Sequence, residues 1–157
     1  MVFLAGLSPE IGERVALLSN VSLFSRCTRR ELVDIAAHVR EIRVPSGTTL
    51  TVEGETGEEF FVLAEGLAWA TVGDEKVGSI LPGSCFGEMA LLDGGERAAT
   101  VTTQLPSRLL VLDRGAFKGL VRGFSGVTEK ILRILAQRIR ALEHGDRLPR
   151  PLSLRPR

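Results

Sequence analysis

The sequence predicts an α+β fold in which an antiparallel β-sandwich or barrel is flanked by helices. Residues 40–112 contain short β-prone runs separated by Gly, Pro or Asp, which is the pattern of many short antiparallel strands. Residues 8–39 and 113–143 instead carry apolar residues at helical spacing. A chain of 157 residues with 44% apolar and 25% charged residues has the size and composition of one globular domain.

Two helices are predicted before the strands. Ser8 followed by Pro9 is a typical helix start. Thr28 with Glu31 three residues later forms a capping box, which opens a second helix that ends near Val39. The residues expected on the core side of these helices are Val15, Leu17, Leu18, Leu32, Ile35 and Ala36.

Turn residues punctuate the strand region at short, regular intervals. The turn signals are residues 45–47 (Pro-Ser-Gly), Gly54, Gly57, Gly66, residues 73–74 (Gly-Asp), residues 82–83 (Pro-Gly) and Pro106. Glycine and proline supply the backbone angles that tight turns need. We therefore interpret most of the 17 glycines as turn residues and assign binding roles only within residues 86–101.

Two further helices are predicted after Leu112. Asp113 can cap the first, and Ser125 or Thr128 opens the second. The second helix has a wide apolar stripe, which the simplest interpretation packs against the strands and which also permits pairing with the same helix of a second copy. The apolar positions are Phe117, Leu120 and Val121 in the first helix and Val127, Ile131, Leu132, Ile134, Leu135, Ile139 and Leu142 in the second.

Residues 144–157 are predicted to form a Pro- and Arg-rich tail or linker. Gly145 ends the preceding helix, and three prolines prevent another. From Glu129 to the end, eight Lys or Arg and three Asp or Glu give a net charge of +5, whereas residues 1–128, with 12 and 16, have −4. A basic end can contact nucleic acid, anionic lipid or an acidic partner, although a solvated linker is the commoner case.

Composition and cysteine usage point to a cytoplasmic protein. No stretch reaches the roughly 18 consecutive apolar residues of a transmembrane helix. Residues 1–14 lack the basic start and the long apolar run of a secretory signal. Cys27 and Cys85 lie in unrelated contexts, which favours free thiols over a disulfide framework.

The most informative segment is residues 86–101, FGEMALLDGGERAATV. A short helical turn is expected to begin at Gly87, where backbone N–H groups and a positive dipole end favour an anion. Nine residues after Glu88, Arg97 offers a planar fork of donors suited to two oxygens of one phosphate. The two alanines that follow allow close approach of the backbone. The chemistry predicted is a phosphate-binding site.

Glu88 narrows the choice of ligand. A carboxylate repels a phosphate unless a hydroxyl donor lies between them, and a 3′,5′-cyclic nucleotide has one free ribose hydroxyl beside a singly charged phosphate. With Glu88 on the 2′-OH and Arg97 on the phosphate, the site would recognise both groups. The alternative is a surface Glu–Arg pair beside a turn, which is typically worth about 0–1 kcal/mol.

The segment resembles the phosphate-binding cassette of cyclic nucleotide-binding domains. The matching motifs are Gly87-Glu88-Met89-Ala90-Leu91 and Arg97-Ala98-Ala99-Thr100-Val101, and the resemblance extends from about Leu18 to Leu142 through residues 45–47, 53–63, 65–66 and 81–83. It implies a jelly-roll barrel (double-stranded β-helix) with a C-terminal hinge and lid helix pair, as one domain over residues 1–143. The ligand-binding residues that it implies are Phe86, Gly87, Glu88, Met89, Ala90, Arg97, Ala98, Ala99 and Val101.

The resemblance also implies a non-catalytic sensor whose C-terminal helices move over the bound base and control a fused or partner effector. The candidate base caps are Arg133, Gln137 and Arg140, since no aromatic residue follows Phe124. We expect cAMP to bind better than cGMP, because cGMP readers place Thr or Ser directly after the arginine, where this chain has Ala98. Relatives join this domain to kinases, channels, acetyltransferases and DNA-binding domains, so the output stays open.

Other functions are less well supported. A metal enzyme on a cupin-like barrel needs two or three His and a carboxylate, whereas His38 lies in a predicted helix and His144 near the tail. No His is placed to activate Ser84 or Cys85 as a nucleophile. A DNA-reading helix-turn-helix does not fit in the roughly fifteen Pro-broken residues after the last helix. The main alternative is a degenerate domain that serves only docking or dimerisation, against which intact Glu88 and Arg97 argue.

Overall fold

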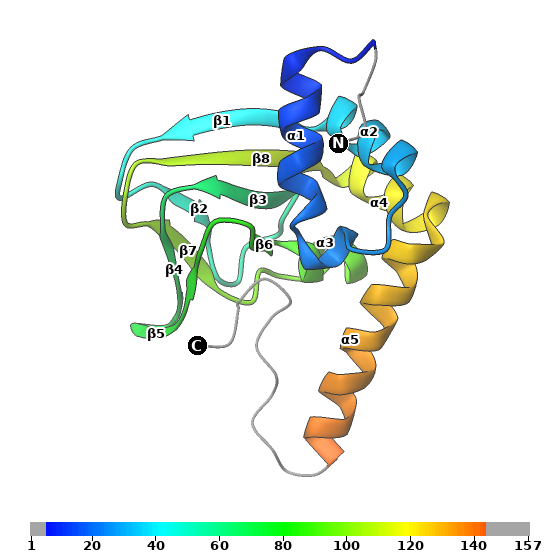
Figure 1. Ribbon diagram of the computed structural model, residues 1–157. Coiled ribbons are helices and arrows are strands. Elements are labelled where there is room, and N and C mark those ends of the chain that lie inside the picture. The colour runs from blue at the N-terminus through cyan, green and yellow to red at the C-terminus, as the bar shows by residue number, and fades with distance from the viewer. Residues whose placement is uncertain (1–5, 144–157) are drawn as a thin grey trace.

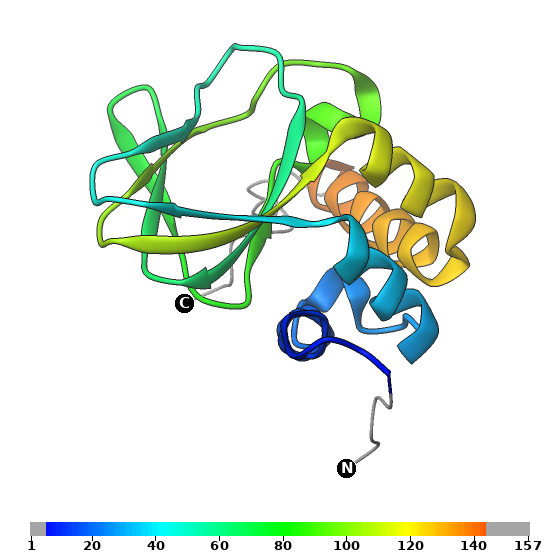
Figure 2. The ribbon, with the colours of Figure 1, turned by 90° about the horizontal axis from the view of Figure 1, so that it is seen from above.

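The computed structural model describes residues 6–143 as a two-sheet β-sandwich with helices gathered at one side (Figure 1, Figure 2). The tail predicted at residues 144–157 lies outside the described residues. The helices are α1 (Pro9–Ser19), the 3₁₀ helix η1 (Ser22–Phe24), α2 (Arg29–His38), α3 (Glu88–Asp93), α4 (Arg114–Gly123) and α5 (Ser125–Glu143). The strands are β1 (Arg40–Val44), β2 (Thr49–Thr51), β3 (Glu59–Glu65), β4 (Ala68–Val72), β5 (Glu75–Ile80), β6 (Cys85–Phe86), β7 (Thr100–Thr103) and β8 (Ser107–Asp113).

The strands form two antiparallel four-stranded sheets. Their strand orders are β1-β8-β3-β6 and β2-β7-β4-β5, so that strands far apart in the sequence become neighbours, as in a jelly roll. In these registers Phe61 lies opposite Val111, and Ala70 lies opposite Val101. The sheets face each other and are not hydrogen-bonded into a closed barrel. The predicted α+β fold with an antiparallel jelly roll is confirmed, as a sandwich.

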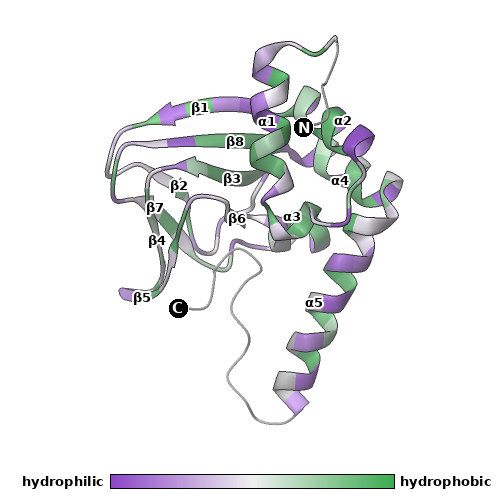
Figure 3. Cartoon of the chain, viewed as in Figure 1, coloured by the Kyte–Doolittle hydropathy of each residue, from purple (hydrophilic) through white to green (hydrophobic). Residues whose placement is uncertain are grey.

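Strands β3 and β8 are buried on both faces. Phe61 and Leu109 belong to the cluster between the two sheets, whereas Phe60 and Leu110 belong to the cluster beneath the helices. Because side chains alternate along a strand, both faces must be apolar, and Figure 3 shows hydrophobic colouring along both strands. This double burial explains the uninterrupted apolar runs at residues 60–64 and 109–112.

Three aromatic rings fasten the helices to the outer face of the first sheet. Phe60 of β3 stacks on Phe117 of α4 with ring centroids 5.0 Å apart, and it meets Phe24 of η1 edge-on at 6.1 Å. All three side chains are fully buried. The sequence did not predict η1, because three residues are too short to show a helical period.

The predicted N-terminal helices are confirmed. The Ser8 hydroxyl caps α1 by accepting a hydrogen bond from the Ile11 N–H at 3.3 Å. Thr28 and Glu31 form the expected capping box, with bonds of 3.2 and 2.8 Å. The expected core residues Val15, Leu18, Leu32, Ile35 and Ala36 are buried, and Leu17 is partly buried against them.

The predicted C-terminal helices also form, with two differences. Asp113 occupies the N-cap position of α4 as expected, but its side chain makes no capping hydrogen bond and lies 3.9 Å from an arginine of β1. The apolar stripe of α5 divides into two sides: Val127 and Ile131 are buried, whereas Leu132 and Ile139 are 60% and 57% exposed. Packing against the rest of the domain therefore explains only one side of α5.

Within residues 6–143, no helix is long and apolar enough to cross a membrane. The same residues contain no group of three or more His, Cys, Asp or Glu side chains placed to hold a metal ion. His38 lies at the exposed end of α2, where its Nδ1 is 2.7 Å from the Asp34 carbonyl oxygen.

Candidate phosphate-binding site

Two glycines set the ends of the short helix in residues 86–101. Gly87 takes a φ of +98° at the N-cap of α3, and Gly94 takes a φ of +69° at its C-cap. Both angles lie in the left-handed region, which residues with a Cβ rarely adopt. The helix therefore begins and ends where glycine allows, and Glu88 is its first residue.

Arg97 lies in a slot built from backbone. Its Nη1 donates to the Gly87 carbonyl oxygen at 3.0 Å, and its Nη2 donates to the Glu59 carbonyl oxygen at 2.7 Å. A Cβ added to Gly57 would lie 2.1 Å from the Arg97 Nε, so the absence of a side chain there gives the guanidinium its room. The carbonyl oxygens of Gly87 and Glu59, together with the space at Gly57, thus fix the position of the Arg97 guanidinium.

The site concentrates buried charge. Glu88 is 1% exposed and Arg97 is 8% exposed. Burial lowers the pKa of Arg97, and the nearby carboxylates of Glu88 and Glu58 act in the opposite direction. Because an arginine guanidinium is not deprotonated in proteins, Arg97 stays protonated at neutral pH. The structure therefore brings a permanent cation close to the buried acidic residue Glu88.

Backbone pairing joins the loop before β3 to the chain around Arg97. The Arg97 N–H donates to the Glu55 carbonyl oxygen at 2.7 Å, and the Gly54 N–H donates to the Arg97 carbonyl oxygen at 3.0 Å. The Thr100 hydroxyl accepts from the Glu53 N–H at 3.0 Å. The Thr100 hydroxyl therefore already has a hydrogen-bond partner within the domain. Strand β7 begins at this residue, three positions after Arg97.

The other predicted site residues divide between core and surface. Phe86, Ala90 and Val101 are buried. Ala98 is exposed and Ala99 is half-buried.

Sequence reasoning missed Gly57, Glu58 and Glu59 as site residues. All three lie in the run 53–63 that carries the resemblance, but residue type does not reveal what they do. Gly57 contributes by lacking a side chain, and Glu59 contributes a main-chain carbonyl. Such backbone roles become visible only when the partner's position is known.

Arg114, the first residue of α4, connects this helix to the site. Its N–H donates to the Glu58 carbonyl oxygen at 2.8 Å, and its Nη1 lies 3.5 Å from the Glu58 carboxylate. Its Nη2 lies near the end of α3, since a Cβ on Gly94 would be 3.1 Å away. Because Glu58 also acts on Arg97, α4 and the site share one acidic residue.

The candidate base caps lie on the exposed part of α5. Arg133, Gln137 and Arg140 line, with Ala136, a shallow hollow of about 270 Å³ on this helix. Arg133 pairs with Glu129 one turn earlier at 3.1 Å. Helix α5 packs against α4 and η1 and then runs away from the sandwich (Figure 1). In this conformation the described packing does not bring the candidate caps to Arg97.

Cys85 does not have the properties of a nucleophile. It is fully buried, and burial, followed by the charge of Glu88, raises the pKa of its thiol well above the usual value. A thiol is nucleophilic as its thiolate, which this environment disfavours. The neighbouring Ser84 is also buried.

Comparison with known proteins identifies the family. The cyclic nucleotide-binding domain family matches residues 41–123, more than half of the chain, and the chain belongs to this family. It is 35% identical over 113 residues to a cAMP-dependent protein kinase regulatory subunit of Mucor circinelloides f. lusitanicus, covering 69% of this chain and 26% of that protein. It is 26% identical over 129 residues to a CRP-like cAMP-activated global transcriptional regulator of Mycobacterium tuberculosis, covering 79% and 58%.

Solved structures share the fold. The cAMP-bound PfPKA-R superposes with a TM-score of 0.75 at 27% identity, covering 88% of this chain and 48% of the other. Thermus thermophilus catabolite activator protein gives 0.69 at 26% identity, covering 78% and 60%. The chain thus spans between about a quarter and three fifths of the length of these curated relatives and solved chains.

Replacing Gly57 by alanine is expected to weaken nucleotide binding about tenfold while leaving the fold intact. The new Cβ would overlap the Arg97 Nε and Cζ, at 2.1 and 2.2 Å, so that the flexible side chain must leave its slot. The expected loss corresponds to one hydrogen bond to a charged group. Titration calorimetry measures it. Gly119→Ala is the matched control, because a Cβ there meets nothing within 4 Å. Equal affinity of the two variants for the nucleotide would contradict the role of Gly57 in making room for Arg97.

Proposed function

We propose that the chain is a cyclic nucleotide sensor that binds its ligand at residues 86–101, with Arg97 on the cyclic phosphate and Glu88 on the ribose 2′-OH. The observation that carries the proposal is the buried Arg97 guanidinium, held by the carbonyl oxygens of Gly87 and Glu59 near buried Glu88. A guanidinium has five N–H donors, so it can keep both carbonyls and still meet a phosphate. The cAMP in the names of its relatives supports this choice of ligand.

The preferred ligand is cAMP. The 2-amino group of a syn guanine reaches toward the residue after the arginine, and Ala98 has no hydroxyl to accept its hydrogen bond. A buried polar group without a partner costs about 1–3 kcal/mol, or roughly ten- to hundredfold in affinity. Titration with cAMP, cGMP and linear 5′-AMP tests the proposal. We expect cAMP to bind tightest, and equal binding of cGMP would contradict the selectivity.

A degenerate domain that serves docking or dimerisation without ligand is the competing function. The same titration separates the two, because that domain would bind none of the three nucleotides. Burial of both Glu88 and Arg97 favours the sensor. Removing two charged side chains from water costs free energy, and a docking module that binds no ligand gains nothing from that cost.

Nucleotide binding is proposed to move α4 and α5. Arg114 connects the first turn of α4 to Glu58, and Glu58 lies close enough to influence Arg97, so a phosphate on Arg97 changes the charge that α4 meets. A base bound beside the sandwich needs a cover, which Arg133, Gln137 or Arg140 supplies if α5 turns inward. A ligand that contacts more of the protein in the closed form shifts the equilibrium toward it.

Hydrogen exchange tests this coupling. With cAMP, amides in residues 113–142 are expected to gain protection in addition to those of residues 86–101, because the closed form packs α5 over the ligand. Linear 5′-AMP at the same concentration is the control. Protection confined to residues 86–101 would mean a binding site without a switch.

Helix α5 is also proposed to pair with a second copy of the chain. Leu132 and Ile139 are seven residues apart and more than half exposed, and Leu135 lies between them in the spacing of a coiled-coil seam. Sedimentation at several concentrations tests for a dimer, and Leu132→Lys, which puts a charge in the seam, is expected to abolish it. A monomer at all concentrations would contradict this pairing.

The sensor is proposed to be non-catalytic and to act on a fused or partner effector. Its output lies outside the site described here, because relatives of this family couple the same fold to different activities. A cytoplasmic location, expected from the cysteine usage, stays a prediction. The domain limits 1–143, with helices 8–39 and 113–143 around strands 40–112, are proposed for the same unit.

A further inference from the structure

A second cluster of charge lies on the outer face of the first sheet, apart from the phosphate-binding site. Its centre is Arg108 of β8, whose side chain is 8% exposed. Carboxylates from three different elements surround it: Glu13 of α1 at 2.8 Å, Glu41 of β1 at 3.3 Å and Glu65 of β3 at 3.6 Å. Glu13 is the one member of this set that comes from a helix, so it ties α1 to the sheet.

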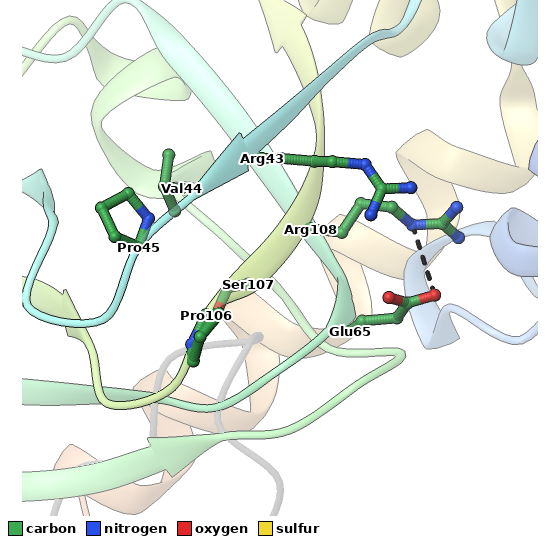
Figure 4. A pocket seen from close by; sticks show the side chains of 7 residues that line it. All are labelled: Arg43, Val44, Pro45, Glu65, Pro106, Ser107 and Arg108. Carbon is green, nitrogen blue, oxygen red and sulfur yellow. Dashed lines mark ion pairs between the residues drawn. The ribbon is translucent and has the colours of Figure 1, made fainter.

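Strand register places a second arginine in the cluster. Arg43 of β1 and Glu65 of β3 flank Arg108 as direct cross-strand neighbours. Figure 4 shows the charged ends of these three side chains together at one end of a groove of about 460 Å³. The other end of the groove is lined by Val44, Pro45, Pro106 and Ser107.

The charges balance differently with and without α1. With the helix in place, two arginines and three glutamates give the cluster a net charge of −1. If Glu13 withdraws, Arg43, Arg108, Glu41 and Glu65 remain on the sheet and sum to zero. Losing the partner of a buried charge is normally strongly destabilising. Here the guanidinium keeps two carboxylates within 3.6 Å, so that penalty is largely avoided.

We propose that Arg108 is a releasable anchor for α1. The Glu13–Arg108 ion pair adds to the apolar contacts of Val15 and Leu18 that hold the helix on the core. Glu41 and Glu65 hold the guanidinium when the helix detaches, so that the sandwich survives the release. Helix α1 packs on α2 and η1, and α5 also packs on η1. The anchor therefore supports, through η1, the surface against which α5 packs. This support does not require bound nucleotide.

Hydrogen exchange without nucleotide tests the anchor. In Glu13→Gln, amides 12–19 of α1 are expected to exchange about tenfold faster, as loss of a charge-assisted hydrogen bond predicts, while β3 and β8 exchange as in the unmodified chain. In 1 M NaCl the unmodified α1 should also exchange faster, because Glu13 is 57% exposed and its ion pair can be screened. Salt should have little effect on α1 in Glu13→Gln.

Glu10→Gln is the matched control. It removes the same charge from the same helix, and Glu10 makes none of the ion pairs found in residues 6–143. Its α1 amides are expected to exchange within about twofold of the unmodified chain, as fits a modest helix-dipole effect. Equal exchange in the two variants would overturn the anchor. If α1, β3 and β8 of Glu13→Gln lose protection equally, the ion pair supports the whole fold. That result would overturn the proposal that α1 detaches while the sandwich stays folded.

Discussion

Replacement of Arg97 by alanine is expected to lower cAMP affinity by about 2–5 kcal/mol, roughly 30-fold or more. The variant would leave the cyclic phosphate in a buried site without its cation. The groups that surround the Arg97 guanidinium cannot replace its charge, because Glu88 and Glu58 are acidic and the two hydrogen-bond partners are backbone carbonyls. Titration calorimetry with cAMP measures the loss, and circular dichroism confirms that the variant is folded.

Two graded variants make the result specific. Arg97→Lys is expected to recover only part of the affinity, because an ammonium cannot make the two-pronged contact of a guanidinium. Glu88→Gln should cost less than Arg97→Ala, since the amide oxygen still accepts the 2′-OH hydrogen bond. Arg43→Ala removes an exposed arginine of β1 and is the control for net charge. If Arg97→Ala binds within threefold of the unmodified chain, residues 86–101 are not the binding site.

The fold could be predicted from the sequence wherever local signals agree with the global structure. Capping residues such as Ser8 and Thr28 mark the starts of α1 and α2, and turn residues separate the strands. The order of strands could not be predicted from such signals, because pairing β1 with β8 depends on contacts between residues about seventy positions apart. The resemblance supplied the jelly roll, and the registers then confirmed it.

The two charged residues of the candidate site could be named from the sequence, whereas the backbone groups around Arg97 could not. Glu88 and Arg97 are readable from the sequence because their chemistry lies in their side chains. The slot that holds Arg97 is made by the missing side chain of Gly57 and the carbonyl oxygen of Glu59, for which residue type is silent. The same limit applies to Arg108, since its three carboxylates meet only after β1, β3 and α1 have packed together.

Replacement of Phe117 by alanine is expected to lower the free energy of unfolding by about 3–5 kcal/mol, the cost of emptying a buried aromatic position. Phe117 is fully buried and stacks on Phe60 of β3, which in turn contacts Phe24 of η1. Removing the ring leaves a cavity at the point where α4 and η1 meet the sheet. Urea unfolding followed by circular dichroism measures the change.

The control for Phe117→Ala is Leu132→Ala on α5, whose side chain is 60% exposed. Its free energy of unfolding should change by less than about 0.5 kcal/mol, as at most surface positions, when measured at a concentration where the chain is monomeric. A loss below about 1 kcal/mol for Phe117→Ala would mean that α4 is not held through this ring. The full loss would instead show that the aromatic cluster attaches α4 to the sheet. Phe117 lies one turn beyond Arg114, so that α4 contacts the core through Phe117 and the candidate site through Arg114.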